Sequence, residues 1–290
     1  MGRLDYEDAR DIAADVMRRC RMCPVACGAH RLEGKVGACR VADKIVVASA
    51  FLHYGEERVL VGRFGSGTIF LSGCNLHCVF CQNWDISQRV RGEEMTEEDL
   101  VGLMFALEAR GAHNINFVSP THFALPILCA IIRARQKGLR VPIVWNSGGY
   151  DSIEVLQALN GWVEIYMPDA KYADNASAQR FSGVKDYWDV LRANLVEMHN
   201  QVGDLEVEGG IAVRGLLVRH LVLPQGLSGA REVVEFLARR ISSNTFVNIM
   251  GQYRPCYQAR RYRELMEGID WLEFEAVRER ARELGLRLAK

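Results

Sequence analysis

The chain has 290 residues, of which 49% are hydrophobic and 25% charged, an ordinary composition for a globular protein with one main core. Lys plus Arg and Asp plus Glu both number 36, and this balance gives no sign of a nucleic-acid surface or a polybasic membrane patch. Because the charged N-terminus lacks the apolar stretch of a signal peptide and no run approaches the roughly 20 apolar residues of a membrane span, we expect a cytoplasmic protein with no nucleic-acid or membrane partner.

The first 62 residues are predicted to form a cysteine-rich N-terminal module. It contains a short helix, a group of four cysteines and a hairpin around residues 44–52. The spacing of the cysteines is C-x2-C-x3-C-x11-C, at Cys20, Cys23, Cys27 and Cys39. Clustered thiols in a reducing compartment indicate metal more often than disulfides. We therefore expect a second metal site, either zinc or an auxiliary iron-sulfur cluster, with buried or reactive thiols as the alternative.

Residues 63–256 alternate β-branched runs with helical patterns, which is typical of parallel βα units. The expected strands are 68–72, 114–118, 141–145, 163–167, 216–223 and 245–250. The expected helices are 95–111, 122–137, 151–159, 186–200 and 229–241, followed at the C-terminus by 257–267 and 272–285. Right-handed crossovers curl such units into a partial (β/α)6 barrel, on which the helices of residues 257–290 pack. A flat doubly wound sheet is the alternative.

Three more cysteines follow the first expected strand, in the stretch GSGTIFLSGCNLHCVFCQNWDIS. Cys74, Cys78 and Cys81 have the spacing C-x3-C-x2-C. Full protein ligation of a [4Fe-4S] cluster takes four cysteines, so three leave one iron open to a small chelating molecule. Zinc is the alternative, but its obvious fourth ligand, His77, adjoins Cys78 and would have difficulty reaching the same ion.

Polar residues also end the later strands, where a barrel that binds a ligand across its top needs them. The residues that we expect at a cofactor site are Asn116, Ser119, Thr121, Asn146, Asp169 and Lys171. Each of them alone would be unremarkable in a loop. Their position on one rim predicts a binding site, although the sequence assigns no catalytic residue.

These motifs resemble those of the radical S-adenosylmethionine superfamily, whose hallmark is the three-cysteine spacing with an aromatic residue before the last cysteine, here Phe80. The stretches NINFVSPTH, WNSGGYDS, IYMPDAKYAD, VRHLVLP and VNIMGQYRP extend the resemblance to an uncharacterised branch similar to pyruvate formate-lyase activating enzymes. The resemblance implies that the cofactor's methionyl group chelates the open iron and that Phe80 lies near its adenine. It also implies that Lys171 pairs with the cofactor carboxylate while Asp169 orients it.

One element departs from the activating enzymes. They carry a Gly-Gly-Glu type element after the second strand that receives the cofactor's amino group, whereas this chain has Ser-Pro-Thr-His at 119–122. Ser119 or Thr121 would have to serve as the acceptor instead. This departure puts activation of pyruvate formate-lyase itself in doubt.

The activity implied by the resemblance is an oxidoreductase or activase reaction. A reductant protein such as flavodoxin or ferredoxin supplies an electron, and S-adenosylmethionine is cleaved to methionine and a 5′-deoxyadenosyl radical. The leading target is a backbone glycine of a glycyl radical enzyme. The alternatives are a small molecule or another peptide as the substrate and, in a different class, a non-enzymatic metal-binding or electron-transfer protein.

Overall fold

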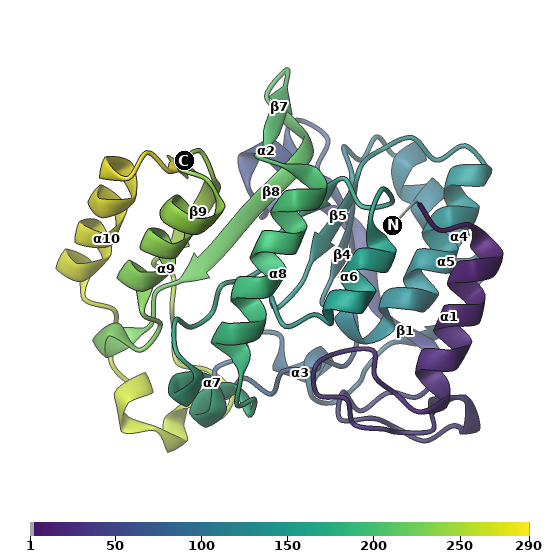
Figure 1. Ribbon diagram of the computed structural model, residues 1–290, viewed down its shortest axis with the longest axis horizontal. Helices are drawn as coiled ribbons and strands as arrows, with labels where there is room; N and C mark the ends of the chain where they lie inside the picture. Colours follow the sequence, from purple (N-terminus) through teal and green to yellow (C-terminus); the bar gives the residue numbers. More distant parts are fainter. Residues whose placement is uncertain (1–2, 290) are drawn as a thin grey trace.

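A sheet of mostly parallel strands organises the computed structural model, which describes residues 3–289 (Figure 1). Six parallel strands lie side by side in chain order: β2 (Ser66–Leu71), β4 (Ile115–Val118), β5 (Ile143–Asn146), β6 (Ile165–Tyr166), β8 (Ile211–Leu221) and β9 (Phe246–Met250). Neighbouring strands in chain order are what repeated βα units produce when they curl into a barrel. The predicted α/β partial barrel is therefore confirmed.

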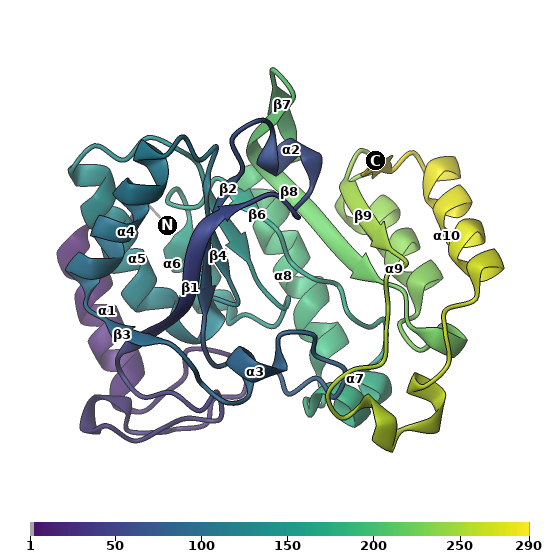
Figure 2. The same cartoon turned by 180° about the vertical axis from the view of Figure 1, so that it is seen from behind.

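Further strands extend the sheet at both edges (Figure 2). At one edge, β1 (Ile45–His53) pairs antiparallel with β2, and β3 (Glu93–Met95) pairs antiparallel with β1. At the other edge, β10 (Arg287–Leu288) pairs parallel with β9. The short strand β7 (Glu206–Glu208) lies away from this row of strands and forms a hairpin with the inner strand β8. The hairpin that we expected at 44–52 is thus wrong, because this segment is one long strand whose partners lie elsewhere in the chain. The sheet also crosses the boundary expected at residue 62, and the division into domains stays a prediction.

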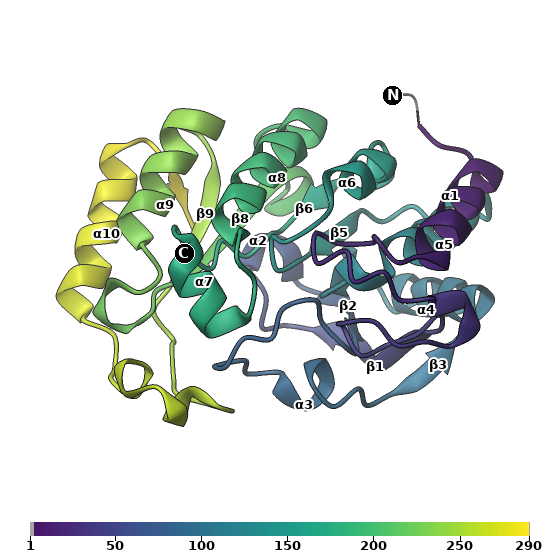
Figure 3. The ribbon, with the colours of Figure 1, turned by 60° about the horizontal axis from the view of Figure 1, so that its bottom comes forward.

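Helices cover the outer face of the sheet in the order of the strands (Figure 3). They are α4 (Glu97–Ala109), α5 (Ala124–Gln136), α6 (Ile153–Leu159), α8 (Tyr187–Val202), α9 (Ala230–Phe236) and α10 (Trp271–Glu283), with α1 (Tyr6–Arg18) against α5. Shorter helices are α2 (Arg58–Val61), α3 (Trp84–Ser87) and α7 (Asn175–Ser182). No helix within residues 3–289 is both long and apolar enough to cross a membrane.

Two local features test the sequence predictions for helices. The helix expected at 95–111 forms as α4, and Thr96 and Asp99 make a capping box at its start, each side chain accepting a hydrogen bond from the other residue's backbone amide. The helix expected at 257–267 is wrong, because the chain there makes two separate turns of 3-10 helix, Ala259–Arg261 and Arg263–Leu265. Each of these turns is too short to bury a continuous apolar stripe.

The inner face of the barrel changes character along the strands. Successive residues of a strand point to opposite faces, so Val144, Ile165 and Leu217 point inward and pack with Leu60 of α2 into a small apolar cluster. Two residues further on, at the carboxyl ends, the same face carries Asn146 after Val144 and Arg219 after Leu217. The apolar cluster therefore closes one end of the barrel and leaves polar side chains at the other end.

Candidate active site

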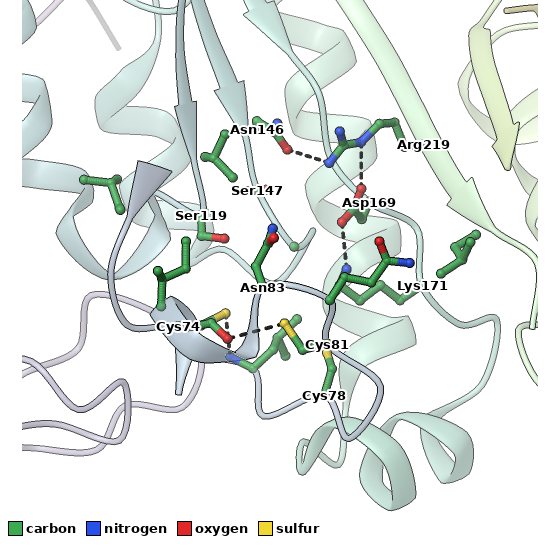
Figure 4. A pocket seen from close by; sticks show the side chains of 18 of the residues that line it. Cys74, Cys78, Cys81, Asn83, Ser119, Asn146, Ser147, Asp169, Lys171 and Arg219 are labelled. Carbon is green, nitrogen blue, oxygen red and sulfur yellow. Dashed lines mark hydrogen bonds and ion pairs between the residues drawn. The ribbon is translucent and has the colours of Figure 1, made fainter. Parts of the chain in front are cut away.

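A cavity of about 200 Å³ lies at the carboxyl ends of the parallel strands (Figure 4). The polar and sulfur-bearing residues of its lining are Cys74, Cys78, Cys81, Gln82, Asn83, Ser87, Ser119, Asn146, Ser147, Asp169, Lys171 and Arg219. The apolar lining comprises Leu71, Leu76, Phe80, Ile86, Val118 and Leu221. The cavity thus combines three thiols, charged groups and apolar walls, as enzyme sites in such barrels commonly do.

The loop that follows β2 brings the three predicted thiols to this cavity, and each sulfur has a hydrogen-bond partner. Ser182 Oγ donates to Cys78 Sγ at 3.0 Å, and the backbone amide of Leu76 donates to Cys74 Sγ at 3.4 Å. Cys81 Sγ lies 3.3 Å from Ser87 Oγ. Such bonds orient thiolates and tune a metal that they bind.

Burial raises the pKa of the Cys74 thiol, and the neighbouring Cys78 adds to this shift. Burial also raises the pKa of Cys78, which cationic Lys171 opposes. Apolar surroundings keep a thiol protonated. A bound metal reverses this preference, because its positive charge stabilises the thiolate and the proton is released. The site therefore favours thiolates only when a metal is bound.

The donor set fits a cluster better than a single zinc ion. Within residues 3–289, no three His, Cys, Asp or Glu side chains converge as the ligands of one ion do, whereas a cubane takes each thiolate on a different iron. His77, the fourth ligand that zinc would need, has its ring Nδ1 at 2.8 Å from Gln88 Oε1 and does not line the cavity. A [4Fe-4S] cluster bound through Cys74, Cys78 and Cys81 suits these positions.

A chain of charged and polar groups forms the opposite wall. Asp169 lies between two cations, with Lys171 Nζ at 2.7 Å and Arg219 Nε at 2.9 Å. Arg219 also donates from Nη2 to Asn146 Oδ1 at 2.7 Å and from Nη1 to Glu56 Oε2 at 3.2 Å. The guanidinium is thus held by three partners from three separate segments, and its plane is fixed relative to the cavity.

Asp169 is ionised in this setting. Burial alone would raise the pKa of its carboxyl, but the charges of Arg219 and Lys171 outweigh burial and lower the pKa to about 2. Burial lowers the pKa of Lys171 and Arg219, and Asp169 reverses this and raises both. The wall therefore presents two permanent cations oriented by one carboxylate.

Ser119, at the end of β4, lines the cavity with an unusual backbone. Its φ is 58°, in the left-handed region that residues other than glycine seldom adopt. Its backbone amide donates to the carbonyl of Asn146 at 2.8 Å, which ties the ends of β4 and β5 together. Conformations of this kind cost about 1–3 kcal/mol and concentrate at functional sites. The backbone at this strand end thus has a conformation that lines the cavity at a cost in local stability.

Of the residues predicted from the sequence, Phe80, Ser119, Asn146, Asp169 and Lys171 line the cavity with the three cysteines. The Phe80 ring packs edge-on against Tyr172 and Tyr253.

Two predicted residues lie behind the lining. Thr121 is buried and donates from Oγ1 to Asp151 Oδ1 at 2.7 Å, so it is a structural residue of the strand end. Asn116 donates from Nδ2 to Glu56 Oε1 at 3.3 Å and supports the wall from behind.

Several residues of the site were not singled out from the sequence. Glu56 comes from the loop between β1 and α2, in the segment expected to be a separate module, and nothing in its surroundings in the sequence marks it. Ser182 lies at the end of α7, a helix that was not predicted. Asn83 could have been found, because it follows Cys81 by two residues and a motif that binds a cofactor seldom ends at its last ligand.

A family model confirms the superfamily for the part of the chain that supplies most of this cavity, all of its lining except Arg219 and Leu221. Residues 68–200 match the model described as Radical SAM superfamily. The uncharacterized protein MJ0674 of Methanocaldococcus jannaschii is 34% identical over 287 residues, which cover 96% of this chain and 78% of that protein. A second uncharacterized protein of the same organism, MJ0808, is 28% identical over 158 residues, 49% of this chain and 46% of the relative.

Solved structures agree in fold. A radical SAM methyltransferase from Sphaerobacter thermophilus has a TM-score of 0.54 at 12% identity, covering 99% of this chain and 93% of the other. Streptococcus suis SuiB bound to the precursor peptide SuiA has a TM-score of 0.50 at 13% identity, covering 75% of this chain and 46% of SuiB. The chain thus spans less than half the length of SuiB. With the cysteine loop, the barrel and these matches together, the chain belongs to the radical SAM superfamily.

Proposed function

We propose that the protein binds a [4Fe-4S] cluster through Cys74, Cys78 and Cys81 and reductively cleaves S-adenosylmethionine in the adjoining cavity. The observation that carries this proposal is the placement of three thiols opposite the Asp169, Lys171 and Arg219 wall in one cavity of about 200 Å³. When bound, the cluster and S-adenosylmethionine supply a one-electron cleavage that gives methionine and a 5′-deoxyadenosyl radical able to take a hydrogen atom from a substrate.

The charged wall suits the methionyl end of the cofactor. Lys171 and Arg219 offer ammonium and guanidinium groups for its carboxylate, a pairing that charge-assisted hydrogen bonds make strong. Asp169 does not bind the carboxylate, because like charges repel; it holds the two cations in place. Ser119 and Asn146 are the acceptors for the cofactor's amino group, in place of the Glu found in the activating enzymes.

The apolar lining serves the other end of the cofactor and the radical. Phe80 offers a ring edge or face to adenine, and its own orientation is fixed by Tyr172 and Tyr253. Leu71, Leu76 and Leu221 limit the water that reaches the reacting atoms. Exclusion of stray hydrogen donors matters here, since a carbon radical abstracts hydrogen from any group within reach.

The test is electron paramagnetic resonance of the anaerobically reconstituted, dithionite-reduced full chain, with and without S-adenosylmethionine, together with chromatography for 5′-deoxyadenosine. We expect a cluster signal that shifts when the cofactor is added, and deoxyadenosine as a product. A flavodoxin or ferredoxin of the host should replace dithionite as the electron source. A cluster signal that ignores S-adenosylmethionine, with no deoxyadenosine, would instead indicate an electron-carrying metal protein.

For the substrate, the first candidate is a backbone glycine of a glycyl radical enzyme. The support is the resemblance to an uncharacterised branch similar to pyruvate formate-lyase activating enzymes, together with the Asp169-x-Lys171 pattern, which resembles one found in those enzymes. We expect a glycyl radical doublet when the reduced protein and S-adenosylmethionine are mixed with such a partner. Absence of the doublet with every glycyl radical enzyme of the host would overturn this candidate while leaving cofactor cleavage intact.

The second candidate is a small molecule or a different peptide, and two observations favour it. Ser119 to His122 stand where the activating enzymes have the Gly-Gly-Glu type element. A second cavity of about 190 Å³ shares Phe80, Asp169 and Lys171 with the first and adds Leu223, Met250 and Gln252; it suits a single side chain or a small compound. Peptide binding by SuiB, which shares the fold, is compatible with the peptide version. Deuterium transfer from a labelled candidate into 5′-deoxyadenosine tests it.

A further inference from the structure

We propose that Cys20, Cys23, Cys27 and Cys39 hold a second metal centre through their thiolates, and that buried Arg31 is its counter-cation. This inference does not depend on cleavage of S-adenosylmethionine. The four cysteines lie on the loops that connect α1 to β1, with Cys20 and Cys39 buried and Cys27 exposed. They are outside the cavity described above.

The backbone folds these loops so that Cys20, Cys27 and Cys39 come near one another. The Cys20 amide donates to the Ala29 carbonyl at 3.0 Å, and the Gly28 amide donates back to the Cys20 carbonyl at 2.9 Å. These bonds place Cys20 beside the backbone that directly follows Cys27. A side-chain carbon added at Gly37 would lie 3.1 Å from Cys27 Sγ and 3.5 Å from Cys39 Sγ. Gly37 therefore lies against two of the four sulfur atoms, where a larger residue would crowd them.

Arg31 is the second, independent observation. Its side chain is 0% exposed, its Nε donates to the Ala42 carbonyl at 2.7 Å and its Nη1 donates to the His122 carbonyl at 2.5 Å. Its Nη2 is buried and has no hydrogen-bond partner among residues 3–289, and no ion pair in this part of the chain includes Arg31. A buried guanidinium without an anion is costly, because its charge has lost its hydration and has no partner.

The groups that can supply the missing negative charge are the thiols, because Arg31 lies between Cys27 and Cys39 in the chain and its Nε is hydrogen-bonded to the carbonyl of Ala42, three residues after Cys39. Neutral thiols would leave the guanidinium unpaired. Four thiolates on a zinc ion or on a [4Fe-4S] cluster leave the centre with a net negative charge. A metal at this site would thus remove the charge imbalance that Arg31 creates.

The sulfur atoms are near one another but do not converge on one point, since no three such side chains in residues 3–289 meet as ligands of one ion do. Zinc would require the loops to close around a single ion, at about 2.3 Å from each sulfur. A cluster takes thiolates that are further apart. A zinc ion and an iron-sulfur cluster are both bound by thiolates, and metal analysis distinguishes them.

The site also contacts the loop of the first cluster. Gly73, with φ of 83°, lies so close that a side-chain carbon there would be 2.7 Å from the Cys39 carbonyl oxygen. Arg40 Nη1 donates to the Gln88 carbonyl at 2.6 Å, just after α3. Figures 1 and 2 both show the N-terminal loops, in purple, at the same edge of the molecule as α3. The second centre would therefore brace the segment that carries Cys74.

Metal analysis of variants tests the proposal. A full-length chain with Cys74, Cys78 and Cys81 changed to Ala cannot bind the first cluster, so any metal that it retains belongs to the second site. We expect about four irons with sulfide, or about one zinc, per chain, and loss of this metal when Cys27→Ser and Cys39→Ser are added. Cys129→Ala is the matched control, because this buried cysteine lies on α5 outside both groups.

Two results would overturn the proposal. One is a folded triple variant, judged by circular dichroism, that holds no metal after anaerobic supply of iron, sulfide and zinc. The other, which does not rely on the variant, is a wild-type chain that binds only about four irons and no zinc. Cleavage of S-adenosylmethionine enters neither result, so this proposal and the proposed function can fail separately.

Arg31 is tested by Arg31→Met, which keeps the volume and removes the charge, with Arg31→Lys as the conservative variant. We expect a chelator to remove the metal of the second site about tenfold faster from Arg31→Met, and Arg31→Lys to restore most of the retention. Equal rates of metal removal from wild type and Arg31→Met would show that Arg31 does not stabilise the proposed centre.

Discussion

The molecule has two loops that carry clustered cysteines, and they differ in what the thiols face. The Cys74 to Cys81 loop opens onto a cavity whose far wall presents Asp169, Lys171 and Arg219. The thiols between Cys20 and Cys39 lie outside that cavity, on loops that also carry one buried cation, Arg31. Three thiols beside a charged cavity leave room for a reactant, whereas four thiols are enough for a complete ligand set. The surroundings, more than the residue type, separate a reactive metal centre from a structural one.

The largest effect should come from Cys78→Ser, which removes a thiolate from the first loop. We expect loss of the first cluster's iron and of all detectable 5′-deoxyadenosine, because a site with two cysteines cannot hold the cubane. Metal at the second loop should remain. Iron and zinc content and deoxyadenosine are measured together, with Cys129→Ala as the control. Loss of metal from both loops would show that the two centres are not independent.

The second-largest effect should come from Asp169→Asn, which tests the role of the charged wall. The substitution removes the carboxylate that Lys171 and Arg219 share and leaves Glu56 as the carboxylate partner of Arg219. We expect kcat/KM for S-adenosylmethionine cleavage to fall about 100-fold. Iron content should be unchanged. Asp189→Asn is the control, because its ion pair with Arg192 is largely exposed and of little energetic weight. A loss of iron in Asp169→Asn would assign the residue to the cluster instead of the cofactor.

A smaller effect is expected from Ser182→Ala, which removes the hydroxyl that donates to Cys78 Sγ at 3.0 Å. Groups that hydrogen bond to a metal ligand typically change affinity or activity by about tenfold or more when removed. We expect the lower end of that range and a more negative reduction potential of the cluster, because the thiolate loses a donor. Potentiometric titration checks the potential. Ser177→Ala, on the same helix but outside these contacts, should leave it unchanged.

The six parallel strands and the main helices could be predicted because β-branched runs and helical periodicity are local signals. Thr121 shows where such signals end: like Ser119 it follows β4, but its hydroxyl donates to buried Asp151 instead of lining the cavity. Glu56 contacts Arg219 across 163 positions of sequence. No local pattern reveals a contact of that range, and the 3-10 turns of 259–265 likewise result from tertiary packing that propensity does not describe.

The smallest effect concerns His122, which connects the two loops. Its Nε2 lies 2.8 Å from the Ser72 carbonyl oxygen, so Nε2 carries the proton and donates it. Its own carbonyl accepts from Arg31 Nη1, and its Nδ1 is buried with no partner among residues 3–289. Burial lowers the pKa of His122 to about 3. The histidine is therefore neutral in the folded protein over the whole range in which it titrates in the unfolded chain.

The sign of the pH effect follows from this lowered pKa. Below about pH 6.5 the unfolded state binds a proton that the folded state does not, so stability is complete above that pH and declines as the pH falls toward about 3. Between pH 7 and pH 6 the His122 contribution should decrease by about 0.7 kcal/mol. Chemical denaturation at pH 7 and pH 6 measures the free energy of unfolding. Wild type should show the decrease and His122→Gln should not, whereas His30→Gln, which changes an exposed histidine, should behave as wild type. If the free energy of unfolding fell by the same amount in all three proteins, the pH dependence would not come from His122.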